Sequence, residues 1–264
     1  VRSSAASDVY KRQPILNKIN IPNIQFRTVE NYAGTLAPKK DSFSTNPLHD
    51  NFVDKNTLTQ IAKSNPRIME LLKSNHIRLD VNIRELEKLK HGHLMDTRVT
   101  AAKIYSALPQ TLKSEVNLMD LQQAAMLHDF GKVLIPDKIL NKNGKLTDKE
   151  KEIMKLHSEL GYELLKKQGV NENVLNLVKY HHQTPDGNGY PEITNDFKPD
   201  ISSQILATAD KYSALREKRS YKDAMTRDEA LAVIQEDVTN SLIAPEVYNL
   251  SLIHISEPTR PEPI

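Results

Sequence analysis

The sequence contains no cysteine and no tryptophan, and aromatic residues make up only 5% of its 264 residues. Without cysteine, disulfide bonds and thiolate metal sites are excluded, so any bound metal must use histidine and carboxylate ligands. No apolar run is long enough to cross a bilayer and no secretory signal is visible, which predicts a cytoplasmic protein without a membrane partner. The formal net charge of +2 gives no electrostatic reason to expect a nucleic-acid partner.

The composition is that of a folded helical protein. With 38% hydrophobic residues the chain can bury a substantial core. Its apolar residues recur at helical spacing, without strand alternation or an internal repeat, so we predict an all-α fold. We assign the helical domain to residues 55–249. Residues 14–54 are rich in Asn, Pro, Ser, Thr and Lys and are expected to form a flexible lead-in.

The two ends of the chain, residues 1–13 and 250–264, are expected to be foreign to the fold. Asp8–Gln13 can be encoded by GAT GTG TAT AAG AGA CAG, and the reverse complement of this string encodes Leu250–Ile255. This relation is typical of sequencing-adapter DNA translated as protein, and a natural tail would not explain it. We therefore exclude both ends from the fold prediction and expect the natural protein to continue beyond them.

Periodicity and capping residues predict where the helices begin. The predicted starts are near Lys55, Pro66, Val81, Leu118, Thr147, Asn171, Ile201 and Asp228. Four of these segments are predicted to end at Leu108, Asp129, Asp210 and Val238. Asn65 is expected to cap one helix, and Thr147 with Glu150 forms a capping box at another. A turn-rich loop is expected over Pro185–Pro191.

A histidine and an aspartate end the helix that is central to the sequence. The apolar residues before His128 and Asp129 would hold this helix rigidly, so that one nitrogen and one oxygen ligand lie side by side. Gly131 is expected to release the chain, and Lys132 to place a cation near an anion on the metal. Taken alone, the pair is better explained by a buried histidine that makes an ordinary hydrogen bond.

Further histidines and acids lie on, or at the end of, the apolar faces of predicted helices. The full set is His93, His128, Asp129, His157, His181, His182 and Asp210. Burying so many imidazoles and carboxylates without a cation would leave too few hydrogen-bond partners, and a divalent metal resolves this conflict. The set exceeds the need of one ion, so we predict two divalent ions, iron or manganese, about 3.5–4 Å apart with Asp129 as the bridge.

The first histidine of this set is ambiguous, because His91 and His93 are close in sequence. Small or apolar residues follow His93 at helical spacing: Thr97, Ala101, Ile104 and Leu108. The corresponding positions after His91 are more polar. His93 is therefore the predicted ligand, and His91 remains the alternative.

The order of these motifs resembles the HD-GYP subfamily of HD-domain phosphohydrolases. The resemblance covers roughly residues 93–248 and is carried by His128-Asp129 with Lys132, His157, His181-His182, the loop Asp186–Pro191 and Asp210. It implies a bacterial metal-dependent phosphodiesterase that hydrolyses cyclic di-GMP with a metal-bridged hydroxide. It implies that the seven residues of the set above bind the metals and that Asp129 and Lys132 are catalytic. It assigns substrate binding to Lys132, Asp186, Gly189, Tyr190 and Pro191.

Departures from the family pattern leave alternatives open for the metal count. Met95, rather than a histidine, stands three residues before Arg98-Val99, and Ser213 replaces a frequent second aspartate. Leu89 lies one turn before His93, so a glutamate for a third ion is not evident, although Glu87 precedes His91 by one turn. Two ions are therefore favoured over three.

The substrate also has alternatives. Gln183, Thr184 and Pro185 replace the acidic and aromatic pair usual after the two histidines. The chain could instead hydrolyse another nucleotide or phosphate ester, or be a catalytically degenerate domain that binds a nucleotide or a protein partner. The sequence leaves a homodimer open.

Overall fold

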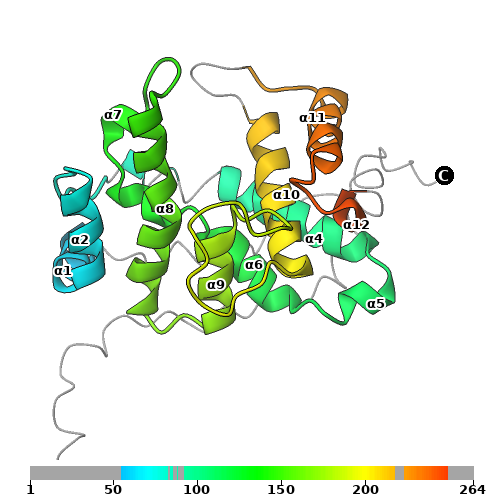
Figure 1. Cartoon of the computed structure of the whole chain (residues 1–264), viewed down its shortest axis with the longest axis horizontal. Helices are drawn as coiled ribbons and strands as arrows, with labels where there is room; N and C mark the ends of the chain where they lie inside the picture. The colour runs from blue at the N-terminus through cyan, green and yellow to red at the C-terminus, as the bar shows by residue number, and fades with distance from the viewer. Residues whose placement is uncertain (1–54, 83, 86–87, 89–91, 218–222, 249–264) are drawn as a thin grey trace, which may run out of the picture. The chain divides into compact units, whose positions relative to one another are not determined.

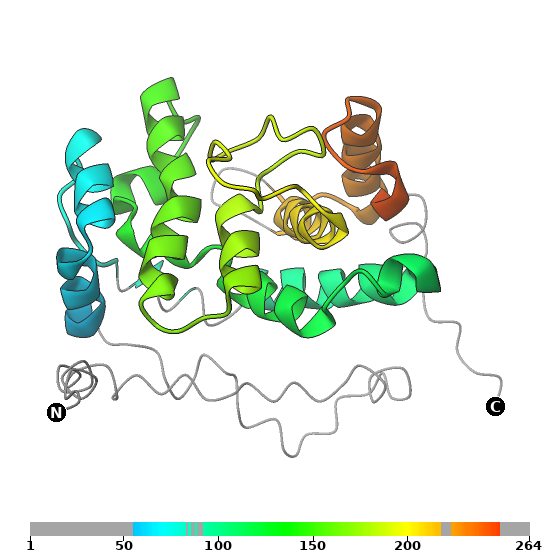
Figure 2. The ribbon, with the colours of Figure 1, turned by 60° about the horizontal axis from the view of Figure 1, so that its bottom comes forward.

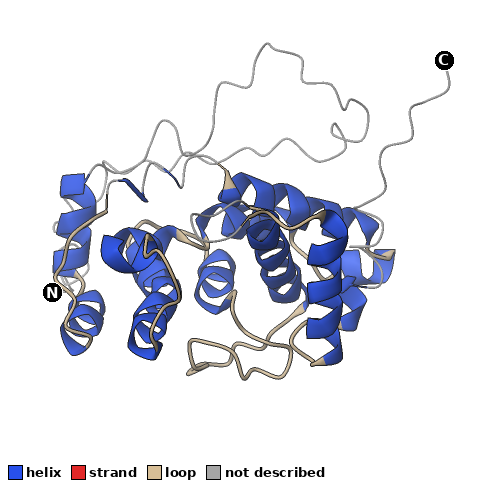
Figure 3. Ribbon diagram, turned by 90° about the horizontal axis from the view of Figure 1, so that it is seen from above, coloured by secondary structure: helices blue, strands red, loops and turns tan. Residues whose placement is uncertain are grey.

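The computed structural model describes residues 55–82, 84–85, 88, 92–217 and 223–248 (Figure 1). The expectations for residues 1–54 and 250–264, and those for Glu87 and His91, lie outside these described residues. Within them every regular element is a helix, and extended chain pairs only in an isolated bridge between His182 and Tyr190 (Figure 3). The predicted all-α class is confirmed. No described helix combines the length and apolar character needed to span a membrane.

The described helices are α1 (Lys55–Ser64), α2 (Pro66–Ser74), α4 (His93–Ala107), α5 (Gln110–Lys113), α6 (Leu118–Leu127), the 3-10 helix η3 (Phe130–Leu134), α7 (Asp137–Leu140), α8 (Asp148–Lys166), α9 (Glu172–Tyr180), α10 (Ile201–Arg216), α11 (Arg227–Thr239) and α12 (Pro245–Val247). Helices α1, α2, α6, α8, α9, α10 and α11 begin within one residue of a predicted start, whereas α5, η3, α7 and α12 were not predicted. The Asn65 side chain caps α2, and Thr147 and Glu150 make both bonds of a capping box at α8. Both predicted caps are confirmed.

Two predicted helix boundaries are wrong. The segment predicted as helical from Val81 is interrupted, because Gly92 has a φ of 85° and α4 begins only at His93. The predicted end of α10 at Asp210 is also wrong, since this helix continues to Arg216. No glycine or proline follows Asp210 within α10, and Ser213 is buried, so nothing local ends the helix there.

The helices that carry the predicted site residues pack directly on one another. Helix α4 lies against α6 and α10, α8 lies against α9 and η3, and α6 also contacts α9 (Figure 2). The interior between them is aliphatic and includes the fully buried Ile104, Leu121, Leu160, Leu164 and Ile205. Each such side chain stabilises the fold by roughly 1.5–3 kcal/mol relative to exposure. This packing fixes the helix ends from which the polar residues project.

Gly131 lies where η3 and α8 are in backbone contact. A Cβ atom at Gly131 would lie 1.9 Å from the carbonyl oxygen of His157 and 2.5 Å from the amide nitrogen of Gly161. The sequence suggested that Gly131 releases the chain after the helix. Its structural role is instead a close approach that no larger residue permits, and this approach places His157 beside the Asp129 segment.

Candidate metal centre

The structure brings the seven predicted metal ligands together where α4, α6, α8, α9 and α10 meet. His93 opens α4, His128 and Asp129 follow α6, His157 lies within α8, His181 and His182 follow α9, and Asp210 lies within α10. Three groups of three have ligand atoms within 4.8 Å of one another: His157–His181–His182, His93–His128–Asp129 and His128–His181–Asp210. Because His128 and His181 each belong to two groups, the residues form one continuous cluster.

Three of the histidines are oriented in the same way by the helices that carry them. The Nδ1 atoms of His128, His157 and His181 lie 2.9, 2.6 and 2.7 Å from the backbone carbonyl oxygen of the residue three positions earlier. A carbonyl oxygen can only accept, so each Nδ1 donates a proton and each neutral ring keeps a lone pair on Nε2. The helix backbone thereby aims three imidazole lone pairs into the cluster, the second shell expected for metal-binding histidines.

Nε2 of His157 and Nε2 of His181 face each other without a proton to share. Nε2 of His157 lies 3.2 Å from Nε2 of His181 and 3.2 Å from Nε2 of His182. Nε2 of His128 is buried and has no hydrogen-bond partner. Lone pairs at such distances repel, whereas a cation bound between them is attracted to each. The nitrogen and oxygen donor set therefore fits a divalent metal.

The two aspartates connect the histidines to one another. Asp129 lies 3.4 Å through Oδ1 from Nε2 of His157, and 3.5 Å through Oδ2 from Nε2 of His128. Asp210 places Oδ1 2.9 Å from Nε2 of His93 and 3.5 Å from Nε2 of His128. Its two oxygens approach different histidines, so Asp129 connects the His157 side of the cluster to the His128 side.

Burial and charge set the protonation of the cluster. Burial raises the pKa of Asp129, but the positive charge of Lys132 and then that of His128 lower it. Together these charges outweigh burial, so the pKa of Asp129 lies well below its usual range. Burial lowers the pKa of His157 to about 4 and that of His182 to about 3. At neutral pH the aspartate is therefore charged and these two imidazoles are neutral, which are the forms that bind metal.

We expect the metal-free protein to lose stability as the pH falls from about 6.5 to about 4. Folded His157 has a pKa of about 4, below that of an unfolded histidine, so the unfolded state takes up the proton first as the pH falls. Each unit of difference lowers the free energy of unfolding by about 1.4 kcal/mol over this window. Denaturant unfolding with a chelator, across this pH range, measures the effect.

The pKa of His128 is shifted in the opposite direction, so its effect on stability must be separated from that of His157. Burial lowers the pKa of His128, but Asp129 and Asp210 raise it more, so its contribution is lost as the pH rises through its folded pKa. The variant His157→Gln is therefore expected to show a smaller loss of stability between about pH 6.5 and 4 than the wild type. An equal or steeper loss in that variant would contradict the assignment to His157.

The loop predicted to flank the substrate lies against the histidine pair. The Tyr190 ring stacks on the His182 ring, with centroids 4.5 Å apart and an interplanar angle of 28°. The backbone N–H of Tyr190 donates to the carbonyl oxygen of His182 over 3.3 Å. The ammonium group of Lys155 lies 5.6 Å from the centroid of the Tyr190 ring. This segment thus lies beside the cluster, and substrate binding by Gly189, Tyr190 and Pro191 stays a prediction.

Asp186 lies in the same loop and shapes it. Its carboxylate is exposed and accepts hydrogen bonds from the Thr184 hydroxyl and from the backbone N–H and side-chain amide of Asn188. The Thr184 bond, and then those from Asn188, lower the pKa of Asp186. These contacts stabilise the turn, and substrate binding by Asp186 stays a prediction.

Sequence reasoning missed two residues around the cluster. Gln183 is 2% exposed and hydrogen-bonds the backbone of Gly189 and Pro191, although the sequence showed it only as a departure from the family pattern. Its position directly after the histidine pair was the available signal. Glu217 places Oε2 4.0 Å from Nδ1 of His93 and was missed because α10 was expected to end earlier.

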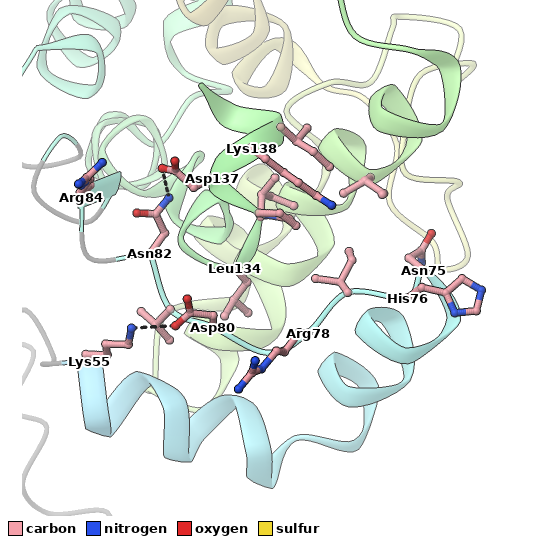
Figure 4. A pocket seen from close by; sticks show the side chains of 16 residues that line it. Lys55, Asn75, His76, Arg78, Asp80, Asn82, Arg84, Leu134, Asp137 and Lys138 are labelled. Carbon is pink, nitrogen blue, oxygen red and sulfur yellow. Dashed lines mark hydrogen bonds and ion pairs between the residues drawn. The ribbon is translucent and has the colours of Figure 1, made fainter. Parts of the chain in front are cut away.

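A cavity of about 590 Å³ has a lining separate from the residues of this cluster, and Figure 4 shows that lining. Its walls come from residues 75–78, 80–82 and 84, from η3 and from α7, and they include Lys55, Asp80 and Lys138. Lys55 and Asp80 form an ion pair of 2.7 Å across one side. None of the predicted site residues lines this cavity, so the buried cluster, rather than the cavity, is the candidate site.

Comparison with known proteins agrees with this arrangement. A family model described as HD domain matches residues 66–247, more than half of the chain. A cyclic di-GMP phosphodiesterase of Thermotoga maritima is 41% identical over 143 residues, which are 53% of this chain and 38% of that protein. The cyclic di-GMP phosphodiesterase response regulator RpfG of Xanthomonas campestris is 41% identical over 125 residues, covering 46% of this chain and 32% of the relative.

A third relative is named for a different substrate. A 3'3'-cGAMP-specific phosphodiesterase of Vibrio cholerae is 33% identical over 135 residues, which are 51% of this chain and 29% of that protein. The chain spans about a third of the length of these relatives. The family model, together with the helical fold and the histidine–aspartate cluster, shows that the chain belongs to the HD domain family. The similar proteins are consistent with the HD-GYP subfamily.

Proposed function

We propose that this chain is a metal-dependent phosphodiesterase domain that hydrolyses cyclic di-GMP. The observation that carries the proposal is the cluster in which Nε2 of His157 lies 3.2 Å from Nε2 of His181, with Asp129 and Asp210 beside the other imidazoles. Two of the similar proteins are named as cyclic di-GMP phosphodiesterases, which supports this substrate. A polar cluster of this density is costly to a fold unless it binds a cation.

We assign the residues to two ions, iron or manganese. His157, His181 and His182 would hold one ion, and His93, His128 and Asp210 the other, with Asp129 between them. Bound ions of this kind lower the pKa of water and offset negative charge on a phosphoryl group. The protein keeps the imidazole rings oriented toward the ions, because the backbone carbonyls of α6, α8 and α9 accept hydrogen bonds from their Nδ1 atoms.

Lys132 is proposed to stabilise charge on the phosphate. Its ammonium group lies 2.6 Å from Oδ2 of Asp129, and its side chain is 23% exposed, so it reaches from the surface to the cluster. The ion pair holds the carboxylate deprotonated and keeps a positive charge beside the ligand position. Lys132 can therefore act both on Asp129 and on an anionic substrate.

We expect Lys132→Met to lower kcat by about 10²–10³-fold, the usual cost of removing one donor that stabilises transition-state charge. Asp129 stays buried and next to His128, so the variant should still bind metal. Kinetics under saturating substrate and metal analysis of the same preparation measure both properties. Lys132→Arg keeps the charge and serves as the control, with a smaller loss expected. Wild-type kcat in Lys132→Met would contradict this role.

The substrate is tested by turnover of a defined panel. Metal-loaded protein is incubated with cyclic di-GMP, 3'3'-cGAMP and nucleoside monophosphates, and products are separated by chromatography. Cleavage of cyclic di-GMP supports the proposal. Preferential cleavage of 3'3'-cGAMP would favour that dinucleotide as the substrate instead, as the name of the Vibrio cholerae relative suggests. Hydrolysis of monophosphates alone, or binding of cyclic di-GMP without cleavage, would contradict the proposed reaction.

A further inference from the structure

We propose that Gln183 is a positioning residue that holds the segment Gly189–Pro191 against the histidine pair and so sets the affinity for substrate without contributing to metal binding. The part that concerns substrate rests on the proposed function above. The part that concerns the position of the segment stands on geometry alone. Gln183 follows His182 directly, so one short stretch carries both the imidazoles of the cluster and the side chain that holds the loop over them.

The Gln183 amide bonds to both ends of this segment. Its Oε1 accepts a hydrogen bond from the backbone N–H of Gly189 over 3.0 Å, and its Nε2 donates to the backbone carbonyl of Pro191. The residue is 2% exposed, so water does not compete for these bonds. Tyr190 lies between the two bonded positions, and its ring stacks on His182. The orientation of Tyr190 is therefore fixed from both sides by one side chain.

The same segment is pressed against the backbone that carries Gln183. A Cβ atom at Gly189 would lie 2.1 Å from the carbonyl oxygen of His182 and 2.6 Å from Cα of Gln183. The hydrogen bond from the Gly189 N–H to Gln183 is part-buried, and a group away from bulk water that loses its partner pays a desolvation cost. Gln183 thus supplies a bond that water cannot readily replace.

A primary amide matches both partners at this position. The Gly189 N–H needs an acceptor and the Pro191 carbonyl needs a donor, and an amide side chain provides one of each. A carboxylate would keep the first bond and set a negative charge against the Pro191 carbonyl. A leucine of similar size would fill the space and make neither bond. Glutamine, glutamate and leucine at position 183 therefore form a series of similar volume. They make two, one and none of these hydrogen bonds.

The absence of tryptophan from the chain permits a direct measurement of the segment. Tyr190→Trp introduces a single indole beside His182, and acrylamide quenching then reports how closely the segment is held. Adding Gln183→Leu is expected to raise the quenching constant by about threefold, since both bonds are lost. Gln183→Glu should give an intermediate value. Gln204→Leu is the matched control, because Gln204 is also buried but neither of its amide atoms has a hydrogen-bond partner.

Kinetics and metal analysis separate a positioning role from a merely structural one. Without Tyr190→Trp, Gln183→Leu should raise KM by about tenfold while kcat changes by less than about threefold and the metal content stays at the wild-type level. Unchanged quenching in Gln183→Leu, or equal quenching in Gln204→Leu, would overturn the positioning role. Loss of metal or of kcat in place of the KM effect would do so as well. If the wild type cleaves no cyclic dinucleotide, the proposed function fails, while the quenching series still decides whether Gln183 holds the segment.

Discussion

The variant His128→Ala is expected to lose bound metal and to lower kcat for phosphodiester hydrolysis by at least about 10³-fold. His128 is fully buried, and its Nε2 has no hydrogen-bond partner although Asp129 and Asp210 each place an oxygen 3.5 Å away. It also belongs to two of the three ligand groups, so its removal takes a donor atom from both of these groups. The remaining carboxylates would then face each other with fewer cationic or donor partners.

Metal analysis of purified protein and turnover of cyclic di-GMP measure these two effects in the same sample. His76→Ala is a suitable control, because His76 is an exposed histidine in the turn after α2 and lies outside the ligand groups. Circular dichroism confirms that the helices persist in both variants. Wild-type metal content in His128→Ala would contradict the assignment of this residue as a ligand, whatever the activity.

The variant Gly131→Ala is expected to destabilise the fold by about 3 kcal/mol or more, at the upper end of the cost of overpacking. The added Cβ would lie 1.9 Å from the carbonyl oxygen of His157 and 2.5 Å from the amide nitrogen of Gly161, and both are backbone atoms of α8. Helix α8 can relieve the clash only by moving away from η3. Such a shift would also draw His157 away from Asp129, so metal affinity is expected to fall together with stability.

Denaturant unfolding of metal-free protein measures the loss of stability, and calorimetric titration with manganese measures the loss of affinity. Gly169→Ala is the control, since Gly169 has a φ of 72° but no atom within 4 Å of an added Cβ. It should cost only about 1–2 kcal/mol through backbone strain. A Gly131→Ala variant as stable as Gly169→Ala would show that η3 and α8 tolerate separation.

Much of the local structure follows from short stretches of sequence. Asn65 and the Thr147–Glu150 box cap helices because side-chain oxygens reach backbone N–H groups two or three residues away. The inward face of α4 follows from small and apolar residues at helical spacing after His93. The end of α10 was missed, because a helix without a breaker continues until packing or exposure stops it, and neither can be read locally.

The tertiary structure decided the relations among residues far apart in the chain. Gln183 could be read only as a departure from a motif, until the fold showed which backbone atoms its amide bonds. Gly131 could be read as a chain release, until the approach of α8 showed a contact that excludes any side chain. Both depend on how two separately formed elements lie against each other.

By itself, then, the sequence determined the all-α class, the chemical types of the candidate ligands and the helices that carry them, since composition and periodicity act over a few residues. Only the tertiary structure decided that His157 and His181 meet through Nε2, that Asp129 approaches two histidines, and that α10 brings Asp210 to His93 and His128. The physical reason is that helix periodicity fixes the direction of a side chain relative to its own axis. The distance between two such side chains is fixed by side-chain packing between helices.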